Sequence, residues 1–236
     1  MHHSNQKHLG LLPKARGVGG MVSFQAKLED ELARRGIAVT YELEHDHYDV
    51  LLVVGGTRHL NLLRTIQHKG IPIYQRLDGI NWIHRVSKTG LRHFLRAELA
   101  NRLLARIRNR WADGIIYQSH FVVGWWERKY GPAPVPHSVV HNGVDLDVYT
   151  PKGKHQRPDD HIRVLMVEGS LAGGYELGLD HGIRFSEQLA DRINQPVELM
   201  IVGKADTQVQ LEASRRSRIP LRWVGLVPRE DIPALD

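Results

Sequence analysis

A glycine-rich stretch near the amino terminus, Gly17-Val18-Gly19-Gly20, separates a strand-like segment from a helix-like one. Glycines at such a position let the backbone approach a ligand closely, and the start of a helix offers unpaired N–H groups to an anion. The stretch is neither a full dinucleotide fingerprint, because Val22 replaces the last glycine, nor a P-loop, because no Lys-Ser/Thr follows. A tight strand-to-helix turn explains the glycines equally well. Gly19 and Gly20 are therefore candidate anion-binding residues.

A second segment whose residues could bind a ligand is Asn142-Gly143-Val144-Asp145, which follows a strand-like run. Asn-Gly readily forms a turn with positive φ. In α/β proteins, ligands bind outside the carboxyl ends of the strands, which is where this segment is expected. An ordinary turn is the competing interpretation.

Metal and thiol chemistry have little support in the sequence. The chain has no cysteine, which excludes disulfides, Cys-ligated zinc, thiol nucleophiles and iron–sulfur clusters. Among the 15 histidines, His45-Asp46-His47 resembles a ligand pair, but no third ligand stands at a fixed spacing. We expect no metal site and no cofactor.

Composition indicates a folded protein with anionic partners. Of the 236 residues, 42% are hydrophobic and 25% are charged, which suffices for a core. The 32 basic and 26 acidic residues give a net charge of +6, which favours phosphates, nucleic acid or a lipid surface as partners. The apolar run 50–54 is too short to cross a bilayer, and the amino terminus lacks the apolar stretch of a secretory signal. We expect a cytoplasmic protein.

Strand-like and helix-like segments alternate along the chain, which predicts an α/β fold with parallel sheets wound on both faces. The predicted strands are 8–14, 37–43, 48–54, 71–76, 114–118, 138–141, 162–167, 197–202 and 221–224. The predicted helices are 21–36, 58–69, 91–111, 121–130, 176–193 and 205–218, with a further one beginning near residue 229.

The alternation breaks once, in a polar stretch rich in Pro and Gly. It predicts a first Rossmann-like domain at 1–142, a linker at 143–160 and a second Rossmann-like domain at 161–236. The second series has only three strands, which would leave a sheet edge uncovered. We expect this domain to be incomplete and the chain to be part of a longer protein.

Five segments together resemble family 4 glycosyltransferases of the GT-B fold. They are the glycine stretch 17–20, Ala112-Asp113-Gly114-Ile115-Ile116-Tyr117-Gln118-Ser119, the Asn-Gly-Val-Asp segment within 141–151, and the strand ends at 199–203 and 224–228. The resemblance runs from about Arg16 to the last residue.

The resemblance implies a two-domain enzyme that moves a sugar from a nucleoside-diphosphate-sugar to an unknown glycan, lipid or small-molecule acceptor. The anomeric configuration would be retained and no metal required. The amino-terminal domain would hold the acceptor, the carboxy-terminal domain the donor, and the chemistry would lie in the cleft between them. The departing diphosphate develops charge, so the site needs preorganised N–H donors and cations.

On the acceptor side, the resemblance draws attention to Arg76-Leu77-Asp78-Gly79, at the carboxyl end of the strand 71–76. Arg76 is a candidate phosphate contact, and Asp78, which orients an acceptor hydroxyl, is the candidate catalytic residue. A structural turn is the alternative. Asn142 completes the predicted binding residues of this domain.

On the donor side, the predicted binding residues are Gly169, Ser170, Gly203 and Lys204. Lys204 either meets a donor phosphate or starts a helix. The family's diphosphate-binding Arg and Lys are absent from residues 167–175, where Glu168 stands instead, and its paired glutamates would lie beyond residue 236. We therefore expect the chain by itself to bind donors weakly and to transfer nothing.

Two alternatives stay open: a non-catalytic nucleotide- or phosphate-binding α/β module, and a nucleotide-sugar epimerase on the same fold. Paired glutamates downstream would favour transfer, and their absence would favour a binding role.

The predicted basic helix 91–111 raises the question of whether the protein binds a membrane or a nucleic acid. Its arginines and leucines fall within one arc, whereas an interfacial helix needs them separated, so we expect partly buried arginine stems. No basic motif interleaved with aromatic residues indicates nucleic-acid binding. We expect no nucleic-acid partner and at most weak peripheral contact with a membrane.

Overall fold

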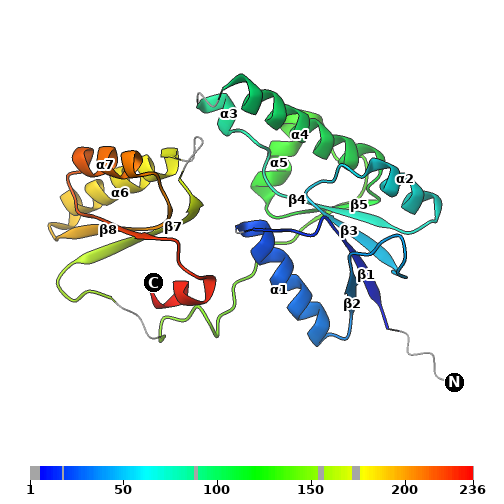
Figure 1. Cartoon of the computed structure of the whole chain (residues 1–236), viewed down its shortest axis with the longest axis horizontal. Coiled ribbons are helices and arrows are strands. Elements are labelled where there is room, and N and C mark those ends of the chain that lie inside the picture. The colour runs from blue at the N-terminus through cyan, green and yellow to red at the C-terminus, as the bar shows by residue number, and fades with distance from the viewer. Residues whose placement is uncertain (1–5, 18, 88–89, 154–156, 172–175, 236) are drawn as a thin grey trace. The chain divides into compact units, whose positions relative to one another are not determined.

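The first sheet has six parallel strands in the order β2-β1-β3-β4-β5-β6 (Figure 1). In the computed structural model, residues 6–17, 19–87, 90–153, 157–171 and 176–235 are described. The strands are β1 (His8–Leu12), β2 (Ala38–Thr40), β3 (Val50–Val54), β4 (Ile73–Leu77), β5 (Gly114–Tyr117) and β6 (His137–Val139). Because the chain reverses its winding direction between β1 and β3, their carboxyl ends form the switch point at which such sheets bind ligands.

Helices cover both faces of this sheet. They are α1 (Gly20–Arg34), α2 (Leu60–His68), α4 (Leu91–Arg110) and α5 (His120–Tyr130). The short α3 (Ile83–Val86) precedes α4 in the chain but groups with the second compact unit described below. In β3, Leu52 and Val54 pack with Phe24 of α1, whereas Leu51 and Val53 share a cluster with residues of α2 and α4. Apolar side chains on both faces explain why β3 is a continuous run of Val and Leu.

The second sheet has three parallel strands in the order β7-β8-β9. They are β7 (Ile162–Ser170), β8 (Val197–Lys204) and β9 (Leu221–Gly225), joined by α6 (Glu176–Ile193) and α7 (Thr207–Arg216) and followed by the 3-10 helix η1 (Arg229–Ala234). Both α helices pack on Leu199 and Ile201 of β8, so they lie on the same face. Leu235, just after η1, lines a pocket with Leu165, which belongs to the opposite face.

The chain divides into two compact units, one of residues 1–82 and 90–142, the other of residues 83–89 and 143–236. The first unit contains the six-stranded sheet and the second the three-stranded one. No helix of the described ranges has the length and apolar character needed to cross a membrane.

The elements follow the predicted alternation, with three differences. The strand predicted at 37–43 is only β2, because the chain turns at residues 42–46. Lys204 ends β8 and does not begin a helix. The four-residue α3 lacks the length over which helical periodicity shows in a sequence.

Candidate functional site

A buried arginine organises the carboxyl edge of the six-stranded sheet. Arg76, near the end of β4, is only 4% exposed. Its Nη1 donates to Asp78 Oδ1 at 2.5 Å and its Nη2 to Asn142 Oδ1 at 2.6 Å. The guanidinium also lies 3.8 Å from the ring centroid of Phe24 in α1. Arg76, Asp78 and Asn142, three of the predicted site residues, thus form one hydrogen-bonded cluster.

Parallel strand order explains how residues so far apart in sequence meet. Asn142 follows β6 and lies 66 positions beyond Arg76. The carboxyl ends of β4, β5 and β6 share one edge, because all three strands run in the same direction. Gln118, just after β5, accepts from Asn142 Nδ2 at 3.3 Å and extends the cluster across that edge.

The carboxylate of the cluster remains accessible although its partner is buried. The Asp78 side chain is 44% exposed, and that of Arg76 is 5% exposed. One oxygen of Asp78 is bound to Arg76, so the other can accept a hydrogen bond from a ligand hydroxyl. The buried Arg76 is therefore better placed to position Asp78 and Asn142 than to contact a phosphate, and its predicted phosphate contact stays untested.

The glycine stretch begins α1 at the same edge. Gly17 and Gly19 have φ of 89° and 130°, which favour glycine, whereas Gly20 is the first helical residue and needs no unusual φ. Among the described residues the first turn of α1 has no side-chain cap and no acidic residue, so its N–H groups can receive an anion. Gly20 stands one turn before Phe24, which packs on Arg76. Val18 lies outside the described residues.

Side chains that the sequence analysis did not name hold this edge in place. Buried Gln25 of α1 accepts from Ala15 N at 2.7 Å and donates to Pro13 O at 2.6 Å, which fixes the chain ahead of the glycines. Trp126 Nε1 donates to Asp78 O at 2.8 Å. Asn101, fully buried in α4, binds the backbone of Asn81 through both its amide atoms. A polar residue on the core side of a helix, as Gln25 and Asn101 are, was the signal available in the sequence.

The predicted donor-side residues lie at the carboxyl ends of β7 and β8. Ser170 pairs with Lys204 across a register shift in β7, and both are exposed. Gly203 has φ of 149°, and a Cβ there would be 1.9 Å from the backbone oxygen of Glu168. This close approach gives Gly203 a structural reason to be glycine, whatever its part in binding. Gly169, by contrast, has open space around its Cα.

Other titratable clusters do not assemble a site. Within the described ranges, no group of three or more His, Asp or Glu is arranged to hold a metal. Asp46 is engaged by Thr40, and His47 Nε2 lies 3.3 Å from Asp49 Oδ1. The backbone N–H of His8 donates to Asp49 and, as the largest cause, lowers the pKa of its carboxyl.

The cluster yields a stability prediction. Arg76→Met keeps an unbranched stem against Phe24 but leaves Asp78 and Asn142 without their donor. We expect the unfolding free energy of the first unit to fall by about 1–3 kcal/mol, because a charged hydrogen bond contributes about that much and Asp78 can regain water. Urea unfolding, monitored by hydrogen exchange of the β4 backbone amides, measures the loss of unfolding free energy. Arg58→Met, at an exposed arginine, is the control, and equal stability of the two variants would contradict a structural role for the cluster.

The chain resembles known proteins in its three-dimensional structure rather than in its sequence. No protein-family model matches the chain, and no curated protein matches it by sequence. The sucrose-phosphate synthase of Thermosynechococcus elongatus matches with a TM-score of 0.65 and 14% identity, over 97% of this chain and 73% of the other. WaaG, a glycosyltransferase involved in lipopolysaccharide biosynthesis, matches with a TM-score of 0.58 and 12% identity, over 96% and 71%. A UDP-forming trehalose-phosphate synthase from Burkholderia xenovorans matches with a TM-score of 0.50 and 14% identity, over 94% and 57%.

These matches establish the fold class. The chain has the α/β architecture of GT-B glycosyltransferases, with parallel Rossmann-like sheets, as the sequence resemblance implied. At these identities the likeness concerns the fold.

Proposed function

We propose that this protein is a retaining glycosyltransferase of the family 4 type. It would move a sugar from a nucleoside-diphosphate-sugar to a hydroxyl group of its acceptor. The observation that carries the proposal is the cluster of Arg76, Asp78 and Asn142 beside the uncapped start of α1. It combines an accessible carboxylate with free N–H donors at the ligand-binding edge of a sheet.

In this proposal the first unit holds the acceptor. Asp78 accepts a hydrogen bond from the acceptor hydroxyl and orients its oxygen toward the anomeric carbon. Arg76, itself bound to Asn142, positions Asp78 by donating a hydrogen bond to its Oδ1, which leaves the other oxygen to accept from the acceptor hydroxyl. The N–H groups at Gly19 and Gly20 stabilise negative charge that develops in the transition state.

The second unit holds the donor. Backbone groups of Gly169, Ser170 and Gly203 would contact the nucleotide, and the Lys204 ammonium would meet the diphosphate. Lys204 is exposed at the end of β8, so its charge is available to a ligand. As the bond from the anomeric carbon to the diphosphate breaks, the acceptor oxygen bonds to the same face of the sugar. The proton of the acceptor hydroxyl passes to an oxygen of the departing diphosphate, which leaves with the bonding electron pair.

A thermal-shift panel tests the donor assignment. We expect uridine or guanosine diphosphate and the matching sugar nucleotides to raise the unfolding temperature at millimolar concentration, and inorganic phosphate to raise it less. Ten-fold excess over Kd corresponds to about 1.4 kcal/mol, which is a shift of several degrees for a domain this size. Lys204→Gln should remove most of the shift, and Lys152→Gln, an exposed lysine outside the sheet, should retain it.

Other outcomes separate the alternatives. A shift from phosphate as large as that from the diphosphates would favour a phosphate-binding module. Conversion of the sugar nucleotide to its epimer, read by proton NMR, would favour an epimerase. A product with inverted anomeric configuration would contradict retention.

A further inference from the structure

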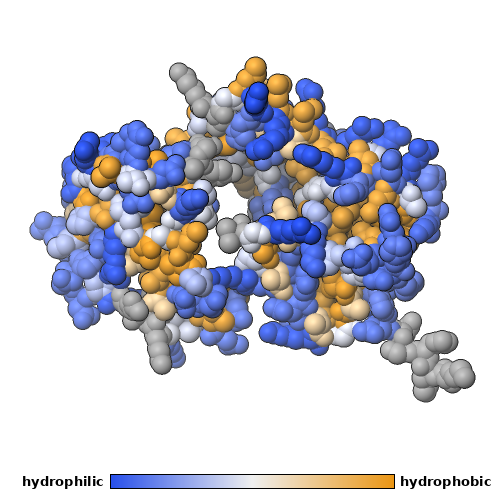
Figure 2. Space-filling view, viewed as in Figure 1, coloured by the Kyte–Doolittle hydropathy of each residue, from blue (hydrophilic) through white to orange (hydrophobic). Residues whose placement is uncertain are grey.

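The outward side of α4 carries a row of exposed leucines. Leu91, Leu95 and Leu99 are 73%, 53% and 62% exposed and stand four residues apart, so they share one stripe of the helix. The core side of α4 is formed instead by Ala97, Asn101, Ala105, Ile107 and Arg108. Figure 2 shows hydrophobic side chains at the surface over the first turns of α4.

A groove of about 530 Å³ runs along this row. Its floor is aliphatic and consists of Leu95, Leu99, Ala100 and Leu103. Its rim carries Arg58, Arg92 and Arg96, and no carboxylate is among the described residues that line it. We call this feature the α4 groove.

The arginines at the rim of the α4 groove are not neutralised by ion pairs within the described part of the chain. Among the described residues, none of its three rim arginines takes part in an ion pair, and all three are exposed. The one acidic residue of α4, Glu98, lies 3.7 Å from Lys129 of α5. Arg102, Arg106 and Arg110 extend the basic surface along the helix, and they too are exposed. Leucines and arginines of this helix thus face solvent together, and the partial burial of the arginine stems stays a prediction.

We propose that the α4 groove docks the protein onto a bilayer surface that contains anionic phospholipids. The leucines would enter the boundary between headgroups and acyl chains, where burial of exposed apolar area is favourable. The arginines would extend to headgroup level and donate to lipid phosphates, as long basic side chains do at interfaces. The separation of basic and apolar faces that a free interfacial helix needs does not apply to α4, because its opposite face is covered by the protein core and only the outward face can meet the bilayer.

Other occupants fit the α4 groove less well. A second copy of the chain would place arginine rims against each other in a two-fold contact. A single-stranded nucleic acid would favour aromatic stacking platforms, whereas the floor is aliphatic. An anionic bilayer satisfies the leucines and the arginines at once.

Vesicle sedimentation tests the proposal on the whole chain. We expect binding to vesicles of phosphatidylcholine with 30–40% phosphatidylglycerol, a composition on the order of that in anionic membranes, and little binding to phosphatidylcholine alone. Arg92→Gln with Arg96→Gln should lower the partition coefficient about 30-fold, at about fivefold per arginine. Leu95→Gln with Leu99→Gln should lower it at least as far and should do so at high salt as well, because apolar burial is not screened.

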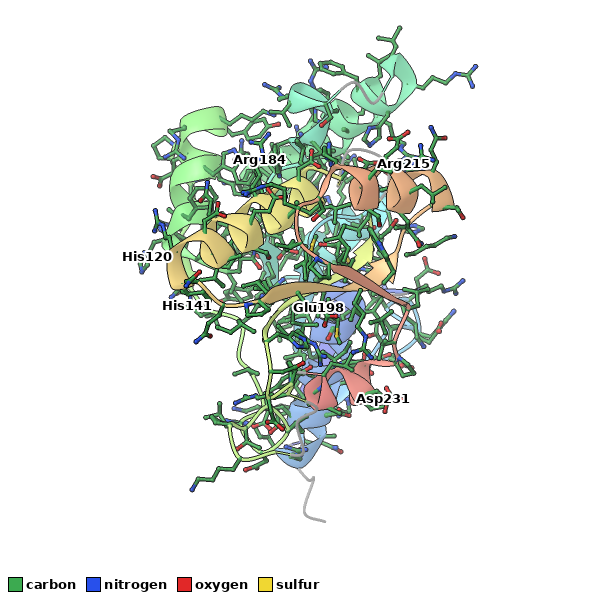
Figure 3. All side chains as sticks on the ribbon, turned by 90° about the vertical axis from the view of Figure 1, so that its left-hand side faces the viewer. His120, His141, Arg184, Glu198, Arg215 and Asp231 are labelled. Atoms are coloured by element: carbon green, nitrogen blue, oxygen red, sulfur yellow. The ribbon has the colours of Figure 1, made fainter. Side chains whose placement is uncertain are left out.

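The controls lie on the second unit, where Arg184 and Arg215 project from α6 and α7 (Figure 3). Arg184→Gln with Arg215→Gln removes the same charge from another surface, and Phe185→Gln with Leu211→Gln removes two apolar side chains that are 58% and 53% exposed. Both control pairs should bind vesicles as the parent protein does. Equal loss in the controls, or a concentration-dependent dimer that Leu95→Gln with Leu99→Gln abolishes, would overturn the proposal. Because the readout is vesicle binding, its failure leaves the proposed transfer activity untouched.

Discussion

Gly203→Ala is expected to unfold the second unit at conditions under which the first unit stays folded. The added Cβ would lie 1.9 Å from the backbone oxygen of Glu168, and φ of 149° is a conformation that alanine rarely adopts. Backbone cannot move aside as a flexible side chain can, so β7 and β8 would have to separate. We expect a loss above about 4 kcal/mol, a large share of the stability of a small domain.

Hydrogen exchange of peptides from β7 and β8, compared with peptides from β3 and β4, measures this loss unit by unit. Gly169→Ala on the neighbouring strand is the matched control, since its added Cβ meets no atom of the described residues within 4 Å and its φ is ordinary. It should change stability by no more than about 0.5 kcal/mol. Equal protection in the two variants would show that the close approach at Gly203 can relax.

Introduced into the full-length enzyme, Gly20→Leu is expected to abolish sugar transfer while the fold survives. No atom of the described residues lies within 4 Å of a Cβ built at Gly20, and Gly20 is helical, so an added side chain points into open space at the start of α1. In the proposed mechanism that space belongs to the ligand. Blocking preorganised N–H donors of this kind lowers turnover by about 100-fold or more.

The test compares initial transfer rates of the full-length parent and variant enzymes, with the donor that the thermal-shift panel identifies, and follows the urea unfolding of both. Ala26→Leu introduces the same side chain at an exposed position of the same helix, and it should leave both rate and stability near the parent values. Undiminished transfer by a well-folded Gly20→Leu protein would assign the glycine stretch to turn formation alone.

The sequence predicted helices and strands well where the hydrophobic periodicity extended over many residues. The helix predicted at 176–193 is α6 to the residue, because its apolar positions recur over five turns on the side that packs against β8. The buried run of β3 and the parallel order of the strands followed from the alternation of elements. The structural matches confirm the resulting fold class.

The spacing of residues along α4 did not predict which face of the helix packs against the core, because tertiary contacts determine this. A helical wheel places the leucines and arginines of α4 in one arc but does not say whether that arc faces core or solvent. The opposite side of α4, which carries Ala97 and Ala105, packs against the sheet, because small side chains let the helix approach the sheet closely. The leucines consequently remain outside, and the α4 groove follows from that choice.

The sequence by itself determined which residue types stood at the ends of the strands: glycines before α1, Arg76 near the end of β4 with Asp78 just after it, and Asn142 after β6. Local spacing is sufficient for this, since strand ends and turns are encoded within a few residues. Only the tertiary structure decided that Arg76 is buried and bound to Asn142, 66 positions away, and that Gly203 meets the backbone of Glu168. Those contacts depend on strand order and register, which are set by the packing of the whole sheet and leave no local pattern in the chain.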